Sequence, residues 1–197
     1  MGTGETSLYH TQSMTQPLDL GPRGQENETI ALEDVRYIIA EDDDYTRSAY
    51  KAWLERIGMN HLEGSFGSVQ ETLSRVKEMV ERGERIDLLI LDKDFFVDAA
   101  HTESDREAAF ELLRQLEAYK DTLNGEERTL VDRIHTILFS GSVRSGDLET
   151  LRTISPTLIG IIEKPSKDFH LRIAGMLGNE GIVPENEHVL KGKQLLS

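Results

Sequence analysis

The sequence predicts an α/β fold with a central parallel sheet. Its clearest strand is the run 88–91, in which four apolar residues follow one another without alternation and lead into Asp92. Such runs are typical of strands that are buried on both faces. The segments between this run and others like it carry apolar residues every three or four positions, which is typical of amphipathic helices. Strands that alternate with helices imply parallel pairing and right-handed crossovers, so we expect a doubly wound sheet.

Five strand–helix units follow one another along the chain. We expect strands at 35–40, 60–63, 88–92, 134–139 and 157–163. The apolar faces of the helices that follow them include positions 45, 49, 53 and 57, then 69, 73, 76 and 80, then 110–116, then 148, 151 and 154, and finally 169, 173 and 177. In the first helix we expect Tyr45 and Trp53 in the core, with Asp43 or Asp44 as the N-terminal cap.

One domain accounts for most of the 197 residues. We expect a flexible N-terminal tail over 1–33, the folded domain over 34–178 and a C-terminal tail over 179–197. Two loops are long for this architecture: 97–107 after the third strand and 118–133 before the fourth. Within the second loop, the segment 126–134 is expected to add one or two helical turns.

Composition excludes several classes of function. The formal net charge of −14 argues against electrostatic binding to nucleic acid or to an anionic membrane. The chain has no cysteine, so it has no disulfide, thiolate metal site or cysteine nucleophile. No stretch resembles a transmembrane segment or a secretion signal, so we expect a cytoplasmic protein.

Polar residues follow four of the predicted strands at the point where each strand ends. Glu41 and Asp42 follow the first strand, Asp92 ends the third, Ser140 follows the fourth, and Lys164 follows the fifth. In an open α/β sheet, ligands bind at the carboxyl ends of the strands. The sequence therefore predicts three carboxylates, a hydroxyl and an ammonium along one edge of the sheet.

This order of an acidic pair, Asp, Ser and Lys-Pro resembles the receiver domain of two-component response regulators, the CheY-like family. The resemblance spans about residues 35–177, and each motif lies at a predicted strand end. It implies a flavodoxin-like sheet with the strand order 2-1-3-4-5, an order that the receiver protein CheY itself exemplifies. In this comparison the loops 97–107 and 118–133 are enlargements of the β3-α3 and α3-β4 connections.

The resemblance also implies a role for each residue at the edge. Asp92 would be the phosphoacceptor, because a carboxylate can attack phosphorus and form an acyl phosphate. Glu41, Asp42, Asp92 and the backbone carbonyl of Asp94 would form a Mg²⁺ site, since neighbouring carboxylates need a counter-ion and Mg²⁺ prefers oxygen ligands. Lys164 would supply a fixed positive charge to the phosphoryl oxygens. Ser140 would hydrogen-bond the phosphoryl group and act as a switch.

By this resemblance the chain is a stand-alone response regulator receiver in phosphorelay signal transduction. It would accept a phosphoryl group from a histidine kinase or a phosphotransfer protein. A downstream protein partner would bind the face formed by the fourth helix, the fifth strand and the fifth helix. The chain would be a self-phosphorylating and self-dephosphorylating signalling domain, not an enzyme, with no nucleic-acid or membrane partner.

Two features depart from the family pattern. Ile161 stands three residues before Lys164, where the family has its switch aromatic. Asp94 places a further carboxylate beside the acceptor, and we expect it to change the lifetime of the acyl phosphate.

Two other functions fit part of the pattern. The order of Asp92, Asp94, Ser140 and Lys164 also resembles haloacid-dehalogenase-type phosphatases, in which the second Asp is a general acid/base. Those enzymes, however, carry a further acidic cluster on a later strand, and here only Asp168 follows closely. The other alternative is a receiver-like binding module without phosphotransfer.

Overall fold

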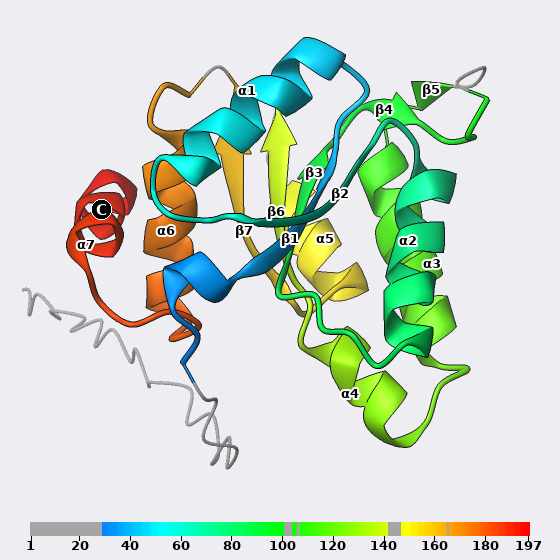
Figure 1. Ribbon diagram of the computed structural model, residues 1–197. Coiled ribbons are helices and arrows are strands. Elements are labelled where there is room, and N and C mark those ends of the chain that lie inside the picture. The colour runs from blue at the N-terminus through cyan, green and yellow to red at the C-terminus, as the bar shows by residue number, and fades with distance from the viewer. Residues whose placement is uncertain (1–28, 101–103, 106, 142–146, 165) are drawn as a thin grey trace, which may run out of the picture.

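The computed structural model describes residues 29–100, 104–105, 107–141, 147–164 and 166–197. Five parallel strands form the central sheet in the order β2-β1-β3-β6-β7 (Figure 1). The strands are β1 (Arg36–Ala40), β2 (His61–Phe66), β3 (Leu88–Asp92), β6 (His135–Ser140) and β7 (Leu158–Glu163). Counted along the chain, these five strands have the order 2-1-3-4-5, so the predicted topology is confirmed.

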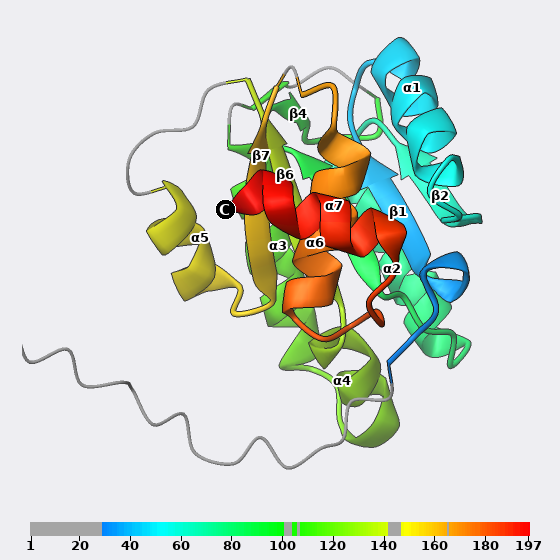
Figure 2. The ribbon, with the colours of Figure 1, turned by 90° about the vertical axis from the view of Figure 1, so that its left-hand side faces the viewer.

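Helices cover both faces of the sheet (Figures 1 and 2). One face carries α1 (Asp44–Glu55) and α6 (Phe169–Asn179), and the other carries α2 (Val69–Glu81), α3 (Ala108–Lys120) and α5 (Asp147–Ile154). Strand β3 shows why the sheet needs both layers, because all five of its residues are buried. Leu89 and Leu91 pack toward α2 and α3, whereas Leu88 and Ile90 pack toward α1 and α6. Burying one such side chain stabilises the fold by about 1.5–3 kcal/mol.

The first helix differs from the prediction in its buried face. Asp43 caps it as expected, and its carboxylate accepts a hydrogen bond of 2.7 Å from the backbone N–H of Thr46. Tyr50 and Leu54 face the core, but the prediction that Tyr45 is buried is wrong, because Tyr45 is 83% exposed. At 3.6 residues per turn, Tyr45 points about 140° away from Tyr50 around the helix axis.

The C-terminal residues form a helix, not the expected tail. Helix α7 (Glu187–Leu196) begins at Asn186, whose side chain accepts a hydrogen bond of 3.0 Å from the backbone N–H of Val189. It packs across α6, and Val189 is fully buried between them. A Cβ atom placed on Gly192 would lie 2.5 Å from the backbone nitrogen of Gly175, so the two helices approach closely at these glycines. The apolar residues of 182–196 do not by themselves predict a helix, because the surface that they pack against is α6.

The N-terminal segment is attached to this same region. The tail expected over 1–33 lies mostly outside the described residues, but 29–33 pack against the domain. The backbone N–H of Ile30 donates to the carbonyl of Ile182 at 2.8 Å, and Leu32 is buried in the 3-10 helix η1 (Leu32–Asp34). Apolar side chains at 30, 32 and 35 therefore extend the core on the side of α1 and α6.

Both predicted enlargements carry secondary structure. In the first, β4 (Phe95–Phe96) pairs antiparallel with β5 (Ser104–Asp105), and the carbonyl of Val97 accepts a hydrogen bond of 3.1 Å from the backbone N–H of Gln70 on α2. Residues 101–103 and 106 of this loop lie outside the described part of the chain. In the second, α4 (Gly125–Asp132) covers most of the segment 126–134 that was predicted to be helical, and Lys120 on α3 pairs with Asp132 at 3.3 Å.

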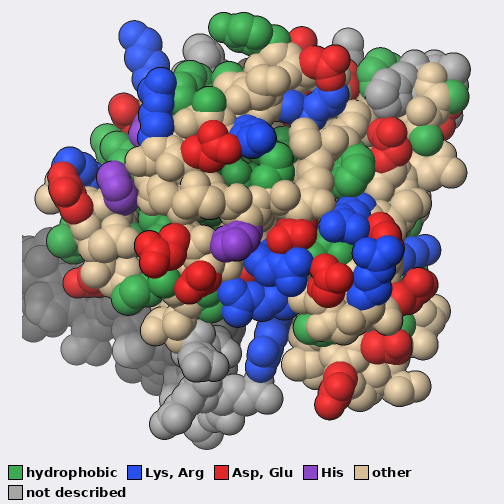
Figure 3. Space-filling model, viewed as in Figure 1, with side chains coloured by type: hydrophobic (Ala, Val, Ile, Leu, Met, Phe, Trp, Pro, Cys, Tyr) green, Lys and Arg blue, Asp and Glu red, His purple; other side chains and the backbone are tan. Residues whose placement is uncertain are grey.

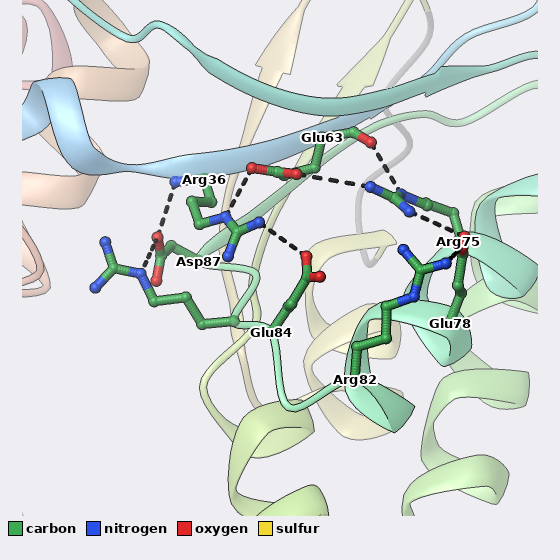
Figure 4. Close-up of polar contacts among 8 residues, drawn as sticks. Arg36, Glu63, Arg75, Glu78, Arg82, Glu84 and Asp87 are labelled. Carbon is green, nitrogen blue, oxygen red and sulfur yellow. Dashed lines mark hydrogen bonds and ion pairs between the residues drawn. The ribbon is translucent and has the colours of Figure 1, made fainter.

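An ion-pair network links the amino ends of β1 and β3 to β2 and α2 (Figure 4). Arg36 pairs with Glu63 at 2.7 Å and with Glu84 at 3.1 Å, and its backbone N–H donates to Asp87 at 2.8 Å. Arg75 joins the same network through Glu63 and Glu78. In Figure 3, Lys and Arg side chains gather near the middle of the visible face with Asp and Glu side chains among them. The network thus holds the end of the sheet opposite to Asp92.

Among the described residues, no helix has the length and apolar character that a membrane span requires.

Candidate functional site

The loop between β1 and α1 presents Glu41 and Asp42 at the carboxyl edge of the sheet. The backbone N–H of Glu41 donates to the carbonyl of Phe66 at the end of β2, at 3.0 Å. This bond continues the pairing of β1 with β2 by one residue. The Glu41 side chain is buried, and that of Asp42 is half-buried. The backbone N–H of Asp43 donates to the Glu41 carboxylate at 3.3 Å, which ties the loop to itself.

Asp92 is the last residue of β3 and lies beside this loop. Each of Glu41, Asp42 and Asp92 offers one carboxylate oxygen, and these three oxygens lie within 4.8 Å of one another. Asp92 is 8% exposed, so an approaching group can reach it only from the edge of the sheet. Three oxygen donors at this spacing fit a hard divalent cation such as Mg²⁺, which is bound mainly through carboxylates and water.

Lys164 comes from the far edge strand and reaches into the same cluster. It follows β7 directly, and its backbone N–H donates to the carbonyl of Ser140 at 2.8 Å. Its Nζ lies 2.5 Å from Oε2 of Glu41 and 2.9 Å from Oδ2 of Asp92. Pro165, the second residue of the Lys-Pro motif, lies outside the described residues.

Ser140 ends β6, the strand between β3 and β7. It is fully buried, and in the sheet it follows Phe139, which pairs with Asp92. The next residue, Gly141, has open space where a Cβ atom would point. The sheet therefore brings together all five predicted side chains, Glu41, Asp42, Asp92, Ser140 and Lys164, at the carboxyl ends of β1, β3, β6 and β7.

Burial governs the electrostatics of the cluster. Desolvation, followed by the charge of Asp92, raises the pKa of Glu41 to about 7, although its hydrogen bond with Lys164 acts in the opposite direction. Burial also raises the pKa of Asp92 against the effect of Lys164. Burial disfavours the ammonium of Lys164, but its bonds to Glu41 and Asp92 outweigh that cost and raise its pKa. When all are ionised, three carboxylates and one ammonium carry −3 + 1 = −2, the charge that a divalent cation balances.

An aromatic cluster lies against Lys164. The ring of Tyr50 is 5.9 Å from Nζ of Lys164, and it packs on Phe139 and Phe169 at centroid distances of 4.9 and 4.8 Å. Trp53 packs on Phe169 at 5.0 Å. Burial, the largest influence, raises the pKa of Tyr50 to about 12, so the phenol stays neutral beside the ammonium. The sequence pattern predicts that Trp53 and Phe169 lie in the core. It misses Tyr50, because it assigns Tyr45 to the buried face of the first helix.

Comparison with solved structures places this architecture among known folds. The receiver domain of RcsB from Salmonella enterica serovar Typhimurium, determined with the phosphomimetic BeF₃⁻, matches with a TM-score of 0.53 and 15% identity over 80% of this chain and 96% of that chain. A LuxR-family DNA-binding response regulator from Staphylococcus aureus matches with a TM-score of 0.51 and 16% identity over 75% of this chain and 98% of that one. The chain has the fold of a response regulator receiver domain.

No family model matches the chain, and no curated protein matches it. At identities of 15–16%, the likeness to the solved receivers concerns the fold.

Two positions in this receiver fold differ from the family pattern. Ile161 on β7 is half-buried and packs against the apolar core on the side of α2, α3 and α5. Asp94, two residues after Asp92, is exposed. The position at which the family has its switch aromatic is thus occupied by an aliphatic residue that packs on the core, and the Asp94 carboxylate faces solvent two residues after Asp92.

Proposed function

We propose that the protein is a phosphorylation-dependent signalling receiver and that Asp92 is its phosphoacceptor. The observation that supports this most is the cluster itself: the carboxylates of Glu41, Asp42 and Asp92 lie together, and Lys164 contacts two of them. The receiver fold supports the same conclusion, because it provides four adjacent strand ends for these groups.

The transfer step uses one carboxylate oxygen of Asp92 as the nucleophile. This oxygen attacks the phosphorus of a phosphohistidine, the P–N bond breaks, and the electron pair of that bond leaves with the imidazole, which is then protonated by solvent. The product is an acyl phosphate on Asp92 and a free histidine on the donor, a histidine kinase or a phosphotransfer protein. Lys164, which already contacts Asp92, would follow the phosphoryl oxygens and stabilise their negative charge.

Mg²⁺ is the cofactor that these residues fit. Glu41, Asp42, Asp92 and the carbonyl of Asp94 would hold it, and it would neutralise the charge that accumulates as one anion approaches another. Asp42 is the most exposed of the three carboxylates in the cluster, which suits a ligand that is reached from solvent.

Ser140 would couple phosphorylation to output. A phosphoryl group on Asp92 offers acceptors to the Ser140 hydroxyl, and that bond would draw the chain after β6 toward the site. The elements that follow, α5 and β7, together with α6, form the face on which we propose that a protein partner binds or dissociates. The net charge of −14 is the reason for proposing no nucleic-acid partner.

The phosphatase alternative receives less support from this architecture. That class carries an additional acidic cluster on a strand after the lysine. In the part of the chain that the structure describes after Lys164, only α6 and α7 follow, and no strand does. A receiver-like module without phosphotransfer has the same geometry, so a chemical test must separate it from the proposed function.

The test is intact-mass measurement after incubation with acetyl phosphate and Mg²⁺. We expect one added phosphoryl group on the native chain and none on Asp92→Asn or in the presence of EDTA. A persistent adduct separates the receiver from a phosphatase, which would release phosphate with turnover. If neither an adduct nor released phosphate is found with acetyl phosphate or with a phosphorylated histidine phosphotransfer protein, the proposal is wrong and the binding module stands.

A further inference from the structure

Arg47, on the second turn of α1, reaches back to the loop that carries the acidic pair. One nitrogen of its guanidinium donates to the backbone carbonyl of Glu41, and another pairs with the carboxylate of Asp44. Both contacts hold the side chain, which is half-buried, in one orientation. The arrangement uses the planar, multi-donor geometry of arginine, which a lysine cannot reproduce.

We infer that Arg47 is a positioning residue that sets the direction of the Asp42 carboxylate. The carbonyl of Glu41 and the N–H of Asp42 belong to one rigid peptide plane. A donor that fixes this carbonyl therefore fixes the plane from which the Cα atom and side chain of Asp42 project. Arg47 would thus preorganise a metal ligand that it does not touch.

The other contacts of the loop leave this carbonyl free to turn. The backbone N–H of Glu41 is held by Phe66, on the preceding peptide plane. The backbone N–H of Asp43 is held by the Glu41 carboxylate, on the following plane. Among the contacts of the described residues, Arg47 is the only side chain that donates to the Glu41 carbonyl. Without it, no side-chain contact of the described residues holds the orientation of the 41–42 peptide plane, and the Asp42 side chain can turn with that plane.

Position and charge predict opposite effects on metal binding, which makes the inference testable. If Arg47 acted only as a positive charge near a cation site, its removal would strengthen Mg²⁺ binding, because like charges repel. If it positions Asp42, its removal weakens binding. The pairing with Asp44 offsets much of the Arg47 charge, so we expect the positional effect to dominate. Loss of a residue that orients a metal ligand typically weakens metal binding by about 10–100-fold.

The experiment is calorimetric titration of Mg²⁺ into the native chain, Arg47→Met and Arg47→Lys. The matched control is Lys51→Met, which removes the same charge from the next turn of α1, where Lys51 pairs with Glu55 at 3.8 Å. We expect about tenfold or greater loss of affinity in Arg47→Met, a smaller loss in Arg47→Lys, and no loss in Lys51→Met. Circular dichroism of each metal-free variant establishes that it is folded.

The inference rests on the proposed function, but the two can fail separately. If the native chain binds no Mg²⁺, the proposed cofactor is wrong. If the native chain binds and Arg47→Met binds equally or more tightly, Arg47 does not position the site and this inference is overturned. Should Arg47→Met fail to fold, Arg47→Lys decides: it keeps the charge, so an unchanged affinity refutes the positional role and a loss supports it.

Discussion

Glu41→Gln should remove a pH dependence of stability that originates in the acidic cluster. In the metal-free chain the pKa of Glu41 is about 7, raised mainly by burial, against an unperturbed value of 4.5. The folded state therefore binds this proton more tightly than the unfolded state does. The resulting stabilisation is complete below about pH 4.5 and is lost as pH rises toward and through about 7.

The size of the effect follows from the shift. One unit of pKa corresponds to about 1.4 kcal/mol, so a shift from 4.5 to about 7 corresponds to about 3 kcal/mol of unfolding free energy. Glutamine has a similar shape and no titratable proton. The difference in unfolding free energy, Glu41→Gln minus native, should therefore rise by about 3 kcal/mol between about pH 4.5 and about pH 8, in favour of the variant.

Urea unfolding of both proteins in EDTA, at several values across this pH range, measures that difference directly. Taking the difference cancels every group that titrates equally in the two chains. Glu63→Gln is the control, because Glu63 takes part in the ion pairs at the other end of the sheet and lies far from the cluster along β2. If the difference in unfolding free energy between Glu41→Gln and the native chain does not change across this pH range, the argument that burial raises the pKa of Glu41 is refuted.

Three further outcomes follow from single contacts. Gly192→Ala would bring a Cβ atom within 1.9 Å of the carbonyl of Leu171, so its melting temperature should fall by several degrees, corresponding to about 1–3 kcal/mol, whereas Leu190→Ala on the exposed side of α7 should change it little. Lys164→Met should lower the initial rate of phosphorylation by acetyl phosphate by about a hundredfold, measured by intact mass, because the phosphoryl charge loses its fixed cation. Asp94→Asn should change the rate at which the acyl phosphate hydrolyses, because the exposed carboxylate acts on the attacking water; an unchanged rate would exclude that role.

The central strand of the sheet was predictable because burial on both faces leaves a continuous apolar run in the sequence. Strand β3 is buried on both faces, and a run such as 88–91 is apolar for that reason alone. The polar residues that close each run then fall at the same edge, since all five strands are parallel. Local pattern and topology therefore specify where Glu41, Asp92 and Lys164 lie.

The terminal elements were not predictable by the same reasoning. Helix α7 is short and contains Gly192 at its centre, which weakens a helix by itself. That glycine is explained only by the close backbone of Gly175 on α6, a contact between two segments that no local pattern connects. Tyr45 shows the converse: it fits an apolar helical spacing but points outward, because the spacing of Tyr50 and Leu54 defines the buried face.

The position of α7 constrains how a signal would leave the site. The proposed output face consists of α5, β7 and α6, and α7 lies across α6 (Figure 2). Exposing α6 would require Val189 and its neighbours to leave the core, at a cost of about 1.5–3 kcal/mol for each large apolar side chain. No such cost attaches to α5, which packs against α3 and β7 on the other face of the sheet from α6 and α7. A partner that responded to the proposed phosphorylation of Asp92 would therefore gain most from contacts on α5, with α7 as a fixed border of its binding surface.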